Sequence, residues 1–196
     1  MIGIIDYGAG NVRSVANALE KLGFESLISG DRKKLQKAEK LILPGVGEAR
    51  SAMASLGKSE LLSWLRDVDV PFLGICLGMQ LLFDHSTERK TDCLGVIEGI
   101  IERFDNARLK VPHMGWNSVN LGVESPLFQG IGADEHFYFV HSYYAPVSEN
   151  TLGVTDYGVR FSSAVRRNNY YGVQFHPEKS GRAGLRILKN FGERCS

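Results

Sequence analysis

The sequence predicts an α/β protein with a mostly parallel central sheet, helices on both faces and an antiparallel extension. Short apolar runs alternate with helical apolar spacing in the first half of the 196 residues, as is typical of a parallel sheet covered by helices. The second half is richer in aromatic and β-branched residues, which favour strands. With 43% hydrophobic residues and no evident linker, we expect residues 1–196 to form a single domain.

The elements of the first half follow from local periodicity. Strands are expected at 2–5, 24–28, 40–43 and 72–75. After the first strand, apolar residues recur at the spacing of an amphipathic helix that Gly23 can end. These residues are Val12, Val15, Ala16 and Leu19. Leu61, Leu62 and Leu65 mark another helix before the fourth strand.

The second half predicts shorter, antiparallel strands and a closing helix. The strands are expected at 95–104, 116–121, 136–145 and 163–173, and the helix at about 181–191. These strands would form the extension of the parallel sheet.

Gly8 and Gly10 follow the first strand and allow two interpretations. One is a dinucleotide-binding loop, but that fingerprint needs a third small residue where Arg13 stands. The other is a glycine turn in which Asn11 caps the following helix. The turn is the favoured interpretation.

Composition limits the classes of partner and the compartment. The chain has 23 basic and 22 acidic residues, so its net charge of +1 predicts neither nucleic-acid nor membrane binding. Cys76, Cys93 and Cys195 lack the spacing of a disulfide framework or a zinc site, and we expect no metal. No secretory signal is evident, and the most apolar stretch, 70–83, is too short to span a bilayer. A cytoplasmic location is therefore expected.

Cys76 lies where an apolar strand runs into an apolar segment with helical spacing. Gly74 and Gly78 stand two residues to either side of it. This pattern is typical of a nucleophile elbow, a tight turn whose neighbours must lack side chains. The turn would place the thiol at a helix N-terminus, where the dipole favours the nucleophilic thiolate. The alternative is a buried structural cysteine.

A second chemical signal lies near the C-terminus. Tyr171, Val173 and Phe175 alternate with less apolar residues and predict a strand that runs toward His176. If the backbone stays extended, His176 and Glu178 point to the same face. A histidine can take a proton from a cysteine, and a carboxylate can hold the imidazole in the correct tautomer. The alternative is a surface loop that caps the next helix.

Together, segments 74–80 and 176–178 resemble the class I glutamine amidotransferases, which have a flavodoxin-like fold. The resemblance extends over nearly the whole chain and implies a triad of Cys76, His176 and Glu178. Segment 44–47 resembles the family's oxyanion strand, in which backbone N–H groups stabilise the developing negative charge. The oxyanion donors implied by the resemblance belong to Gly45, Val46 and Leu77.

Segments 6–11, 112–117 and 139–143 resemble one branch of the family, the glutaminase subunits of imidazole glycerol phosphate synthases. This resemblance implies glutamine as substrate and a separate (β/α)8-barrel cyclase subunit as partner in a heterodimer, with no cofactor. The residues expected to hold glutamine are Gly47, Gln80, Glu88, Ser142 and Tyr143. The residues expected to face the partner are Asn11, Trp116, Tyr138 and Lys179.

Several alternatives stay open. Gln80 and Glu88 can be solvated helix positions, and Trp116 and Tyr138 can be core aromatics. His141 is a candidate second base, although a structural role is favoured because His176 already completes the triad. The 48–50 segment departs from the family pattern and leaves the shape of the oxyanion loop open. At the level of function, the rivals are a cysteine peptidase or γ-glutamyl hydrolase, and a scaffold subunit without catalysis.

Overall fold

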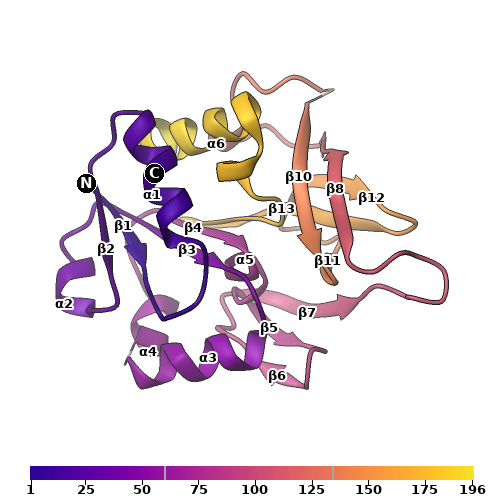
Figure 1. Ribbon diagram of the computed structural model, residues 1–196, viewed down its shortest axis with the longest axis horizontal. Coiled ribbons are helices and arrows are strands. Elements are labelled where there is room, and N and C mark those ends of the chain that lie inside the picture. Colours follow the sequence, from indigo (N-terminus) through magenta and orange to yellow (C-terminus); the bar gives the residue numbers. More distant parts are fainter. Residues whose placement is uncertain (60, 134) are drawn as a thin grey trace.

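The computed structural model describes residues 1–59, 61–133 and 135–196 (Figure 1). Its helices are α1 (Val12–Lys21), α2 (Arg32–Leu35), α3 (Ala49–Lys58), α4 (Leu61–Arg66), α5 (Leu77–Gln80) and α6 (Gly181–Arg194), with 3-10 turns η1 (Pro126–Phe128) and η2 (Pro177–Lys179). The first strands are β1 (Ile2–Ile5), β2 (Ser26–Ser29), β3 (Lys40–Gly45), β4 (Phe72–Cys76), β5 (Phe83–Ser86), β6 (Thr91–Asp92) and β7 (Ile97–Arg103). The later strands are β8 (His113–Ser118), β9 (Asn120–Leu121), β10 (His136–His141), β11 (Tyr143–Pro146), β12 (Thr151–Asp156), β13 (Arg160–Arg167) and β14 (Tyr170–Val173).

The central part of the sheet is parallel, as predicted. Its strands lie in the order β2-β1-β3-β4-β14, and every neighbouring pair among them is parallel. Beyond β14 the sheet continues through β13, β11 and β7, where the pairing is antiparallel. β8 and β10 pair with each other as a separate antiparallel ribbon, drawn at the right of Figure 1. The sequence-based fold class, a parallel sheet with an antiparallel extension, is confirmed.

Helices cover both faces of the parallel part. Successive strand residues alternate between the two faces, so Ile4 packs toward α1 and α6 while Ile5 packs toward α2, α3 and α4. Figure 1 shows α1 and α6 on one side of the sheet and α3 and α4 on the other. Helices thus bury the apolar side chains on both faces of the sheet. In sheets of this kind a binding site lies at the carboxyl ends of the strands, which here include β3 and β4. None of the described helices is both long and apolar enough to cross a membrane.

Four predicted elements differ from the structure. The 116–121 strand is divided at Val119, because β8 pairs with β10 and β9 pairs with β12. The 136–145 strand is divided at Ser142, because β10 pairs within the ribbon and β11 pairs within the main sheet. The 163–173 strand is divided as well, and its second part, β14, is parallel to β4 rather than antiparallel. The helix after Cys76 is a single turn, because the chain turns after Leu82 into β5.

The structure also contains α3, which was not predicted. Its buried residues are Ala49, Ala52 and Leu56, and two small alanines give a weak apolar signal. The glycine loop after β1 is a turn, as favoured. A Cβ on Gly10 would lie 3.0 Å from the carbonyl oxygen of Pro44, and the Asn11 side chain accepts a hydrogen bond from the Ser14 amide at 3.4 Å. The loop therefore packs against the end of β3 and caps α1.

Candidate active site

Cys76 occupies a strained elbow at the carboxyl end of β4. Its φ of 54° lies in the left-handed region that side chains seldom adopt. The flanking glycines are required by close contacts. A Cβ on Gly74 would lie 2.5 Å from the Gly78 carbonyl oxygen, and a Cβ on Gly78 would lie 1.8 Å from the Leu43 carbonyl oxygen. The elbow predicted from the sequence is present.

The thiol of Cys76 lies against a cavity of about 360 Å³. Its Sγ is 3.8 Å from the Val140 carbonyl oxygen and 3.7 Å from Nε2 of Gln174. The cavity brings together Cys76 and most of the residues expected to contact glutamine or its oxyanion. These are Val46, Gly47, Leu77, Gln80, Glu88, Ser142 and Tyr143.

His176 and Glu178 form a buried pair beside this thiol. Nδ1 of His176 lies 2.8 Å from Oε1 of Glu178, and the two side chains are 2% and 1% exposed. The predicted pairing is present, but the expected reason for it was wrong. β14 ends at Val173 and residues 177–179 form a 3-10 turn, so the turn, and not an extended strand, brings the carboxylate back to the ring.

The protonation of His176 follows from its partners. Because the carboxylate of Glu178 can only accept, Nδ1 carries a proton and Nε2 is left to interact with Cys76. Burial alone would lower the pKa of His176, but the hydrogen bond to Glu178 and the interactions with the nearby Cys76 and Glu178 groups raise it to about 9. The site therefore favours a protonated imidazole at His176, beside the sulfur of Cys76.

The loop that carries His176 is tied to the ribbon. The His176 amide donates to the Tyr138 carbonyl at 2.9 Å. The Tyr138 amide donates to Oγ of Ser180 at 2.9 Å, and that hydroxyl donates to the His176 carbonyl at 2.6 Å. The position of the histidine thus depends on β10, the strand that also carries Val140.

Gln80 is a buried wall of the cavity, so the alternative of a solvated helix position is wrong. It is 6% exposed, and its Nε2 donates to the Tyr143 carbonyl and to Oε1 of Gln174, each at 2.9 Å. Gln174 in turn reaches Cys76 and was missed by the sequence reasoning. A signal was present, because Gln174 is two residues from His176 and an extended strand points both to one side.

The 48–50 segment is held by the turn between β5 and β6. Oε2 of Glu88 accepts a 2.7 Å hydrogen bond from the Ala49 amide, and Oε1 of Glu48 lies 2.8 Å from Nε of Arg89. Burial raises the pKa of the Glu88 carboxyl group, partly opposed by the Ala49 hydrogen bond. The segment that follows β3 is therefore held in place by Glu88 and Arg89.

His141 belongs to a neutral hydrogen-bonded chain. Its Nδ1 donates to the Tyr143 carbonyl at 2.8 Å, so its Nε2 must accept from Nδ1 of His113 at 2.9 Å. Nε2 of His113 then accepts from the amide of Asn117 at 3.3 Å. Burial lowers the pKa of His141 to about 3 and that of His113 to about 4. This arrangement supports the structural role favoured for His141.

The residues expected to face a partner lie on the ribbon and near it. Trp116 is 57% exposed, so it is not a core aromatic, and its ring lies 6.0 Å from that of half-buried Tyr138 on the paired strand. Lys179 is exposed in η2, and Asn11 caps α1. Their role at an interface stays a prediction.

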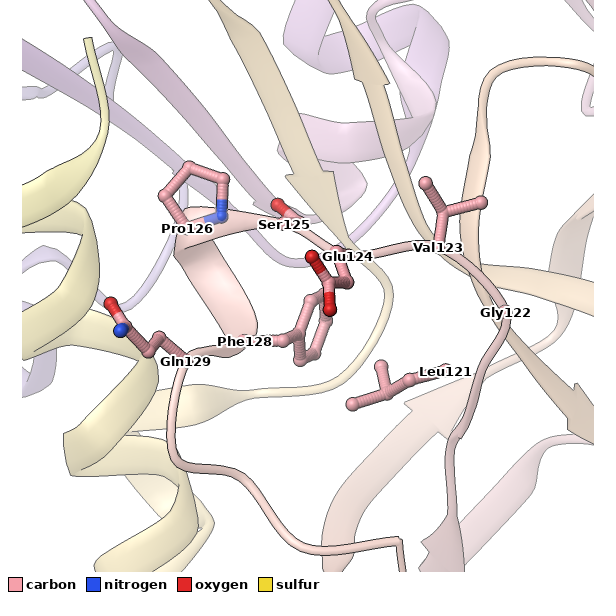
Figure 2. Close-up of a pocket in the computed structure, with 8 residues that line it drawn as sticks. All are labelled: Leu121, Gly122, Val123, Glu124, Ser125, Pro126, Phe128 and Gln129. Carbon is pink, nitrogen blue, oxygen red and sulfur yellow. The ribbon is translucent and has the colours of Figure 1, made fainter.

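A second hollow, of about 660 Å³, is formed by the loop that follows β9 (Figure 2). Among the described residues that line it, Glu124 is the only titratable one, and none is a histidine or a cysteine. No cluster of three or more potential metal ligands occurs among residues 1–59, 61–133 and 135–196. The groups suited to nucleophilic chemistry are those at the Cys76 cavity.

The fold and the site place a cysteine, a histidine and a carboxylate together at the carboxyl end of a parallel sheet, as in cysteine-dependent hydrolases and transferases. The chain matches the family model for glutamine amidotransferase class-I over residues 3–195. It therefore belongs to the class I glutamine amidotransferase family, and its closely similar relatives place it with the HisH-type glutaminase subunits.

Two such relatives are curated subunits of imidazole glycerol phosphate synthase. HisH of Bacteroides fragilis (strain YCH46) is 50% identical over 194 residues, with 98% of each chain covered. HisH 1 of Vibrio vulnificus (strain YJ016) is 47% identical over 196 residues, with 97% of this chain and 96% of the relative covered.

Solved structures with lower sequence identity share the fold. A crystal structure of a glutamine amidotransferase has a TM-score of 0.75 at 22% identity, with 97% of this chain and 98% of that chain covered. PurLQS from Thermotoga maritima has a TM-score of 0.75 at 18% identity, with 100% of this chain and 98% of that chain covered.

Proposed function

We propose that residues 1–196 act as one glutaminase domain of an imidazole glycerol phosphate synthase. The chain hydrolyses glutamine to glutamate and ammonia and delivers the ammonia to a cyclase subunit. That subunit makes imidazole glycerol phosphate and aminoimidazole carboxamide ribotide in histidine biosynthesis. The observation that carries the proposal is the buried His176–Glu178 pair beside Cys76, in a chain about half identical to HisH subunits along its whole length.

The triad performs hydrolysis in two halves. The Cys76 thiolate attacks the side-chain amide carbon of glutamine, and the His176 imidazolium protonates the leaving nitrogen, so that ammonia departs and a thioester remains. His176, now neutral at Nε2, takes a proton from water as that water attacks the thioester. Glutamate leaves, and the thiolate–imidazolium pair is restored. Glu178 stays ionised and holds Nδ1–H throughout.

Negative charge on the reacting oxygen is stabilised by backbone N–H groups of the segments that carry Gly45, Val46 and Leu77. One such donor contributes about 2.7–4 kcal/mol to lowering the barrier. We propose that rotation of the Gly45–Val46 peptide turns an N–H toward this oxygen when the partner binds its nucleotide. The isolated chain is then a poor glutaminase, and activation appears in kcat more than in KM.

The rest of the cavity positions the substrate. Glu88 offers a carboxylate to the α-ammonium group of glutamine, while Gln80, which donates to the Tyr143 carbonyl, forms another part of the wall. Gly47 and Ser142 contact the substrate through their backbone. A cysteine peptidase would need room for a longer chain, whereas a cavity of about 360 Å³ suits one amino acid.

The partner is a (β/α)8-barrel cyclase subunit, and no cofactor takes part in this chain's reaction. Asn11, Trp116, Tyr138 and Lys179 face it. Exposed Met114 and Trp116 side by side on β8 support an interface here, because such aromatic and methionine side chains are enriched in interface cores.

We also propose a cytoplasmic location for this chain. Its three cysteines are free and buried, which suits the reducing cytoplasm.

The central test measures glutamate release by the chain alone, with the barrel subunit, and with the barrel subunit plus its nucleotide. We expect strong activity only in the last case, and none from Cys76→Ala in any case. Turnover by Cys76→Ala would overturn the assignment. Preferential release from γ-glutamyl peptides by the isolated chain would favour the hydrolase alternative.

The interface is tested with Trp116→Ala. Loss of an exposed aromatic anchor should weaken binding of the barrel subunit by about 10-fold or more, with little change in melting temperature. Trp64→Ala is the matched control, since Trp64 lies on α4, on the face of the sheet opposite α1. Unchanged partner affinity in Trp116→Ala would remove this residue from the interface.

A further inference from the structure

Tyr7 places a hydroxyl group beneath the oxyanion segment. The residue follows β1 and is 6% exposed. A Cβ built on Gly45 would lie 2.8 Å from the Tyr7 hydroxyl oxygen and 2.8 Å from Cβ of Leu77. The hydroxyl therefore lies where the end of β3 meets the elbow, next to two of the residues proposed to stabilise the oxyanion.

This hydroxyl has no hydrogen-bond partner among the described residues, although it is buried. A buried hydroxyl without a partner destabilises the folded state, so such a group calls for an explanation. Burial, and then the charge of Cys76, raise the pKa of Tyr7. The phenol therefore stays protonated and is available as a donor.

The geometry of the Gly45–Val46 peptide bond indicates which acceptor the Tyr7 hydroxyl serves. The N–H and the C=O of a trans peptide point in opposite directions. Val46 and Gly47 line the cavity, whereas neither Gly45 nor Tyr7 does. When the Val46 N–H turns into the cavity, the Gly45 carbonyl must turn away from it, to the side on which Tyr7 lies.

We propose that Tyr7 is a positioning residue whose hydroxyl donates a hydrogen bond to the Gly45 carbonyl in the orientation that presents the Val46 N–H to the oxyanion. The proposal rests on the proposed glutaminase function. It assigns the unpartnered hydroxyl to the working state of the site, and it makes the end of β1 part of the oxyanion machinery.

Tyr7→Phe removes only the hydroxyl, and the experiment compares this variant with wild type in the complete complex with the barrel subunit and its nucleotide. We expect kcat for glutamine hydrolysis to fall about three- to tenfold, the effect of one lost hydrogen bond, with KM unchanged. The melting temperature of the isolated chain should stay the same or rise, because there the removed hydroxyl has no partner within the described part of the chain. An unchanged kcat in the complex, or a lower melting temperature of the isolated chain, would overturn the proposal.

Two further measurements separate the oxyanion from the nucleophile. Alkylation of Cys76 by iodoacetamide needs the thiolate but no oxyanion, so its rate should match wild type in Tyr7→Phe. A parallel loss of alkylation would mean that Tyr7 acts on the thiol, which contradicts the proposal. Tyr171→Phe is the matched control, because its buried hydroxyl interacts with Cys195, and it should leave kcat unchanged. Wild-type turnover and an inactive Cys76→Ala verify the glutaminase function independently of both tyrosines.

Discussion

His176 and His141 are both buried beside the Cys76 cavity, yet their protons are arranged in opposite ways. His176 bonds a carboxylate through Nδ1 and leaves Nε2 for the thiol, and its pKa is raised to about 9. His141 bonds a carbonyl through Nδ1 and another imidazole through Nε2, and burial lowers its pKa to about 3.

The difference shows what makes a buried histidine able to work in catalysis. Burial lowers the pKa of both rings, so burial alone does not distinguish them. The two anionic neighbours of His176 reverse the effect and leave one nitrogen free to exchange a proton. His141 cannot accept a proton without breaking its bond to His113, so its neutral chain fixes the Tyr143 carbonyl in place.

Replacing each histidine by alanine tests this contrast most strongly. His176→Ala should lower kcat by about four orders of magnitude or more, because base and acid are lost together. His141→Ala should retain much of the activity but lower the melting temperature by several degrees, since it leaves the buried Nδ1–H of His113 without a partner. Glutaminase assays and thermal melts of both variants distinguish the catalytic role from the structural one. Loss of activity in His141→Ala at an unchanged melting temperature would reverse the two roles.

Glu178→Gln sharpens the account of His176. The carboxylate raises the pKa of His176, so in wild type the imidazolium persists up to about pH 9 and is lost above it. The variant should lower kcat by roughly 10²–10⁴-fold, less than His176→Ala, and should move the alkaline limb of the pH–rate profile to lower pH. A profile with an unmoved alkaline limb would show that Glu178 does not control this proton.

The neutral histidine chain also predicts how stability depends on acid pH. His113 and His141 have folded-state pKa values of about 4 and about 3, below the ordinary value, so the unfolded chain takes up their protons first. Their contribution to stability is complete above pH 6.5 and is lost as the pH falls toward 4. The slope should reach about 1.4 kcal/mol per pH unit for each histidine. Urea unfolding at several pH values measures the slope of the unfolding free energy against pH. The His141→Gln variant should show a smaller slope. An equal slope in that variant would contradict the neutral chain.

Much of this fold was predictable because its signals are local. The alternation of apolar runs predicted the parallel sheet, and two glycines around Cys76 predicted the elbow. The His113–His141 contact was not predictable, because the two residues are brought together by the register of β8 with β10. Nothing in either local segment encodes that register.

The site shows the same division between local and distant information. His176 and Glu178 are near neighbours in the sequence, so their pairing was predicted even though a 3-10 turn replaced the expected strand. The Tyr7 hydroxyl was not singled out, because its position under Gly45 depends on β1 lying next to β3. Contacts between distant segments decide which polar atoms are left without partners.

The close approach of the β3 backbone to Gly78 limits which substitutions this chain tolerates at the elbow. The Leu43 carbonyl oxygen lies 1.8 Å from where any Cβ on Gly78 would be, so even alanine is excluded there. In a saturation-mutagenesis screen scored by growth without histidine, we expect Gly78 to be as intolerant as Cys76, although it has no side chain to offer to chemistry. Intolerance at this elbow can therefore result from backbone crowding as well as from loss of a reacting group, and thiol labelling of the purified inactive variants distinguishes the two causes.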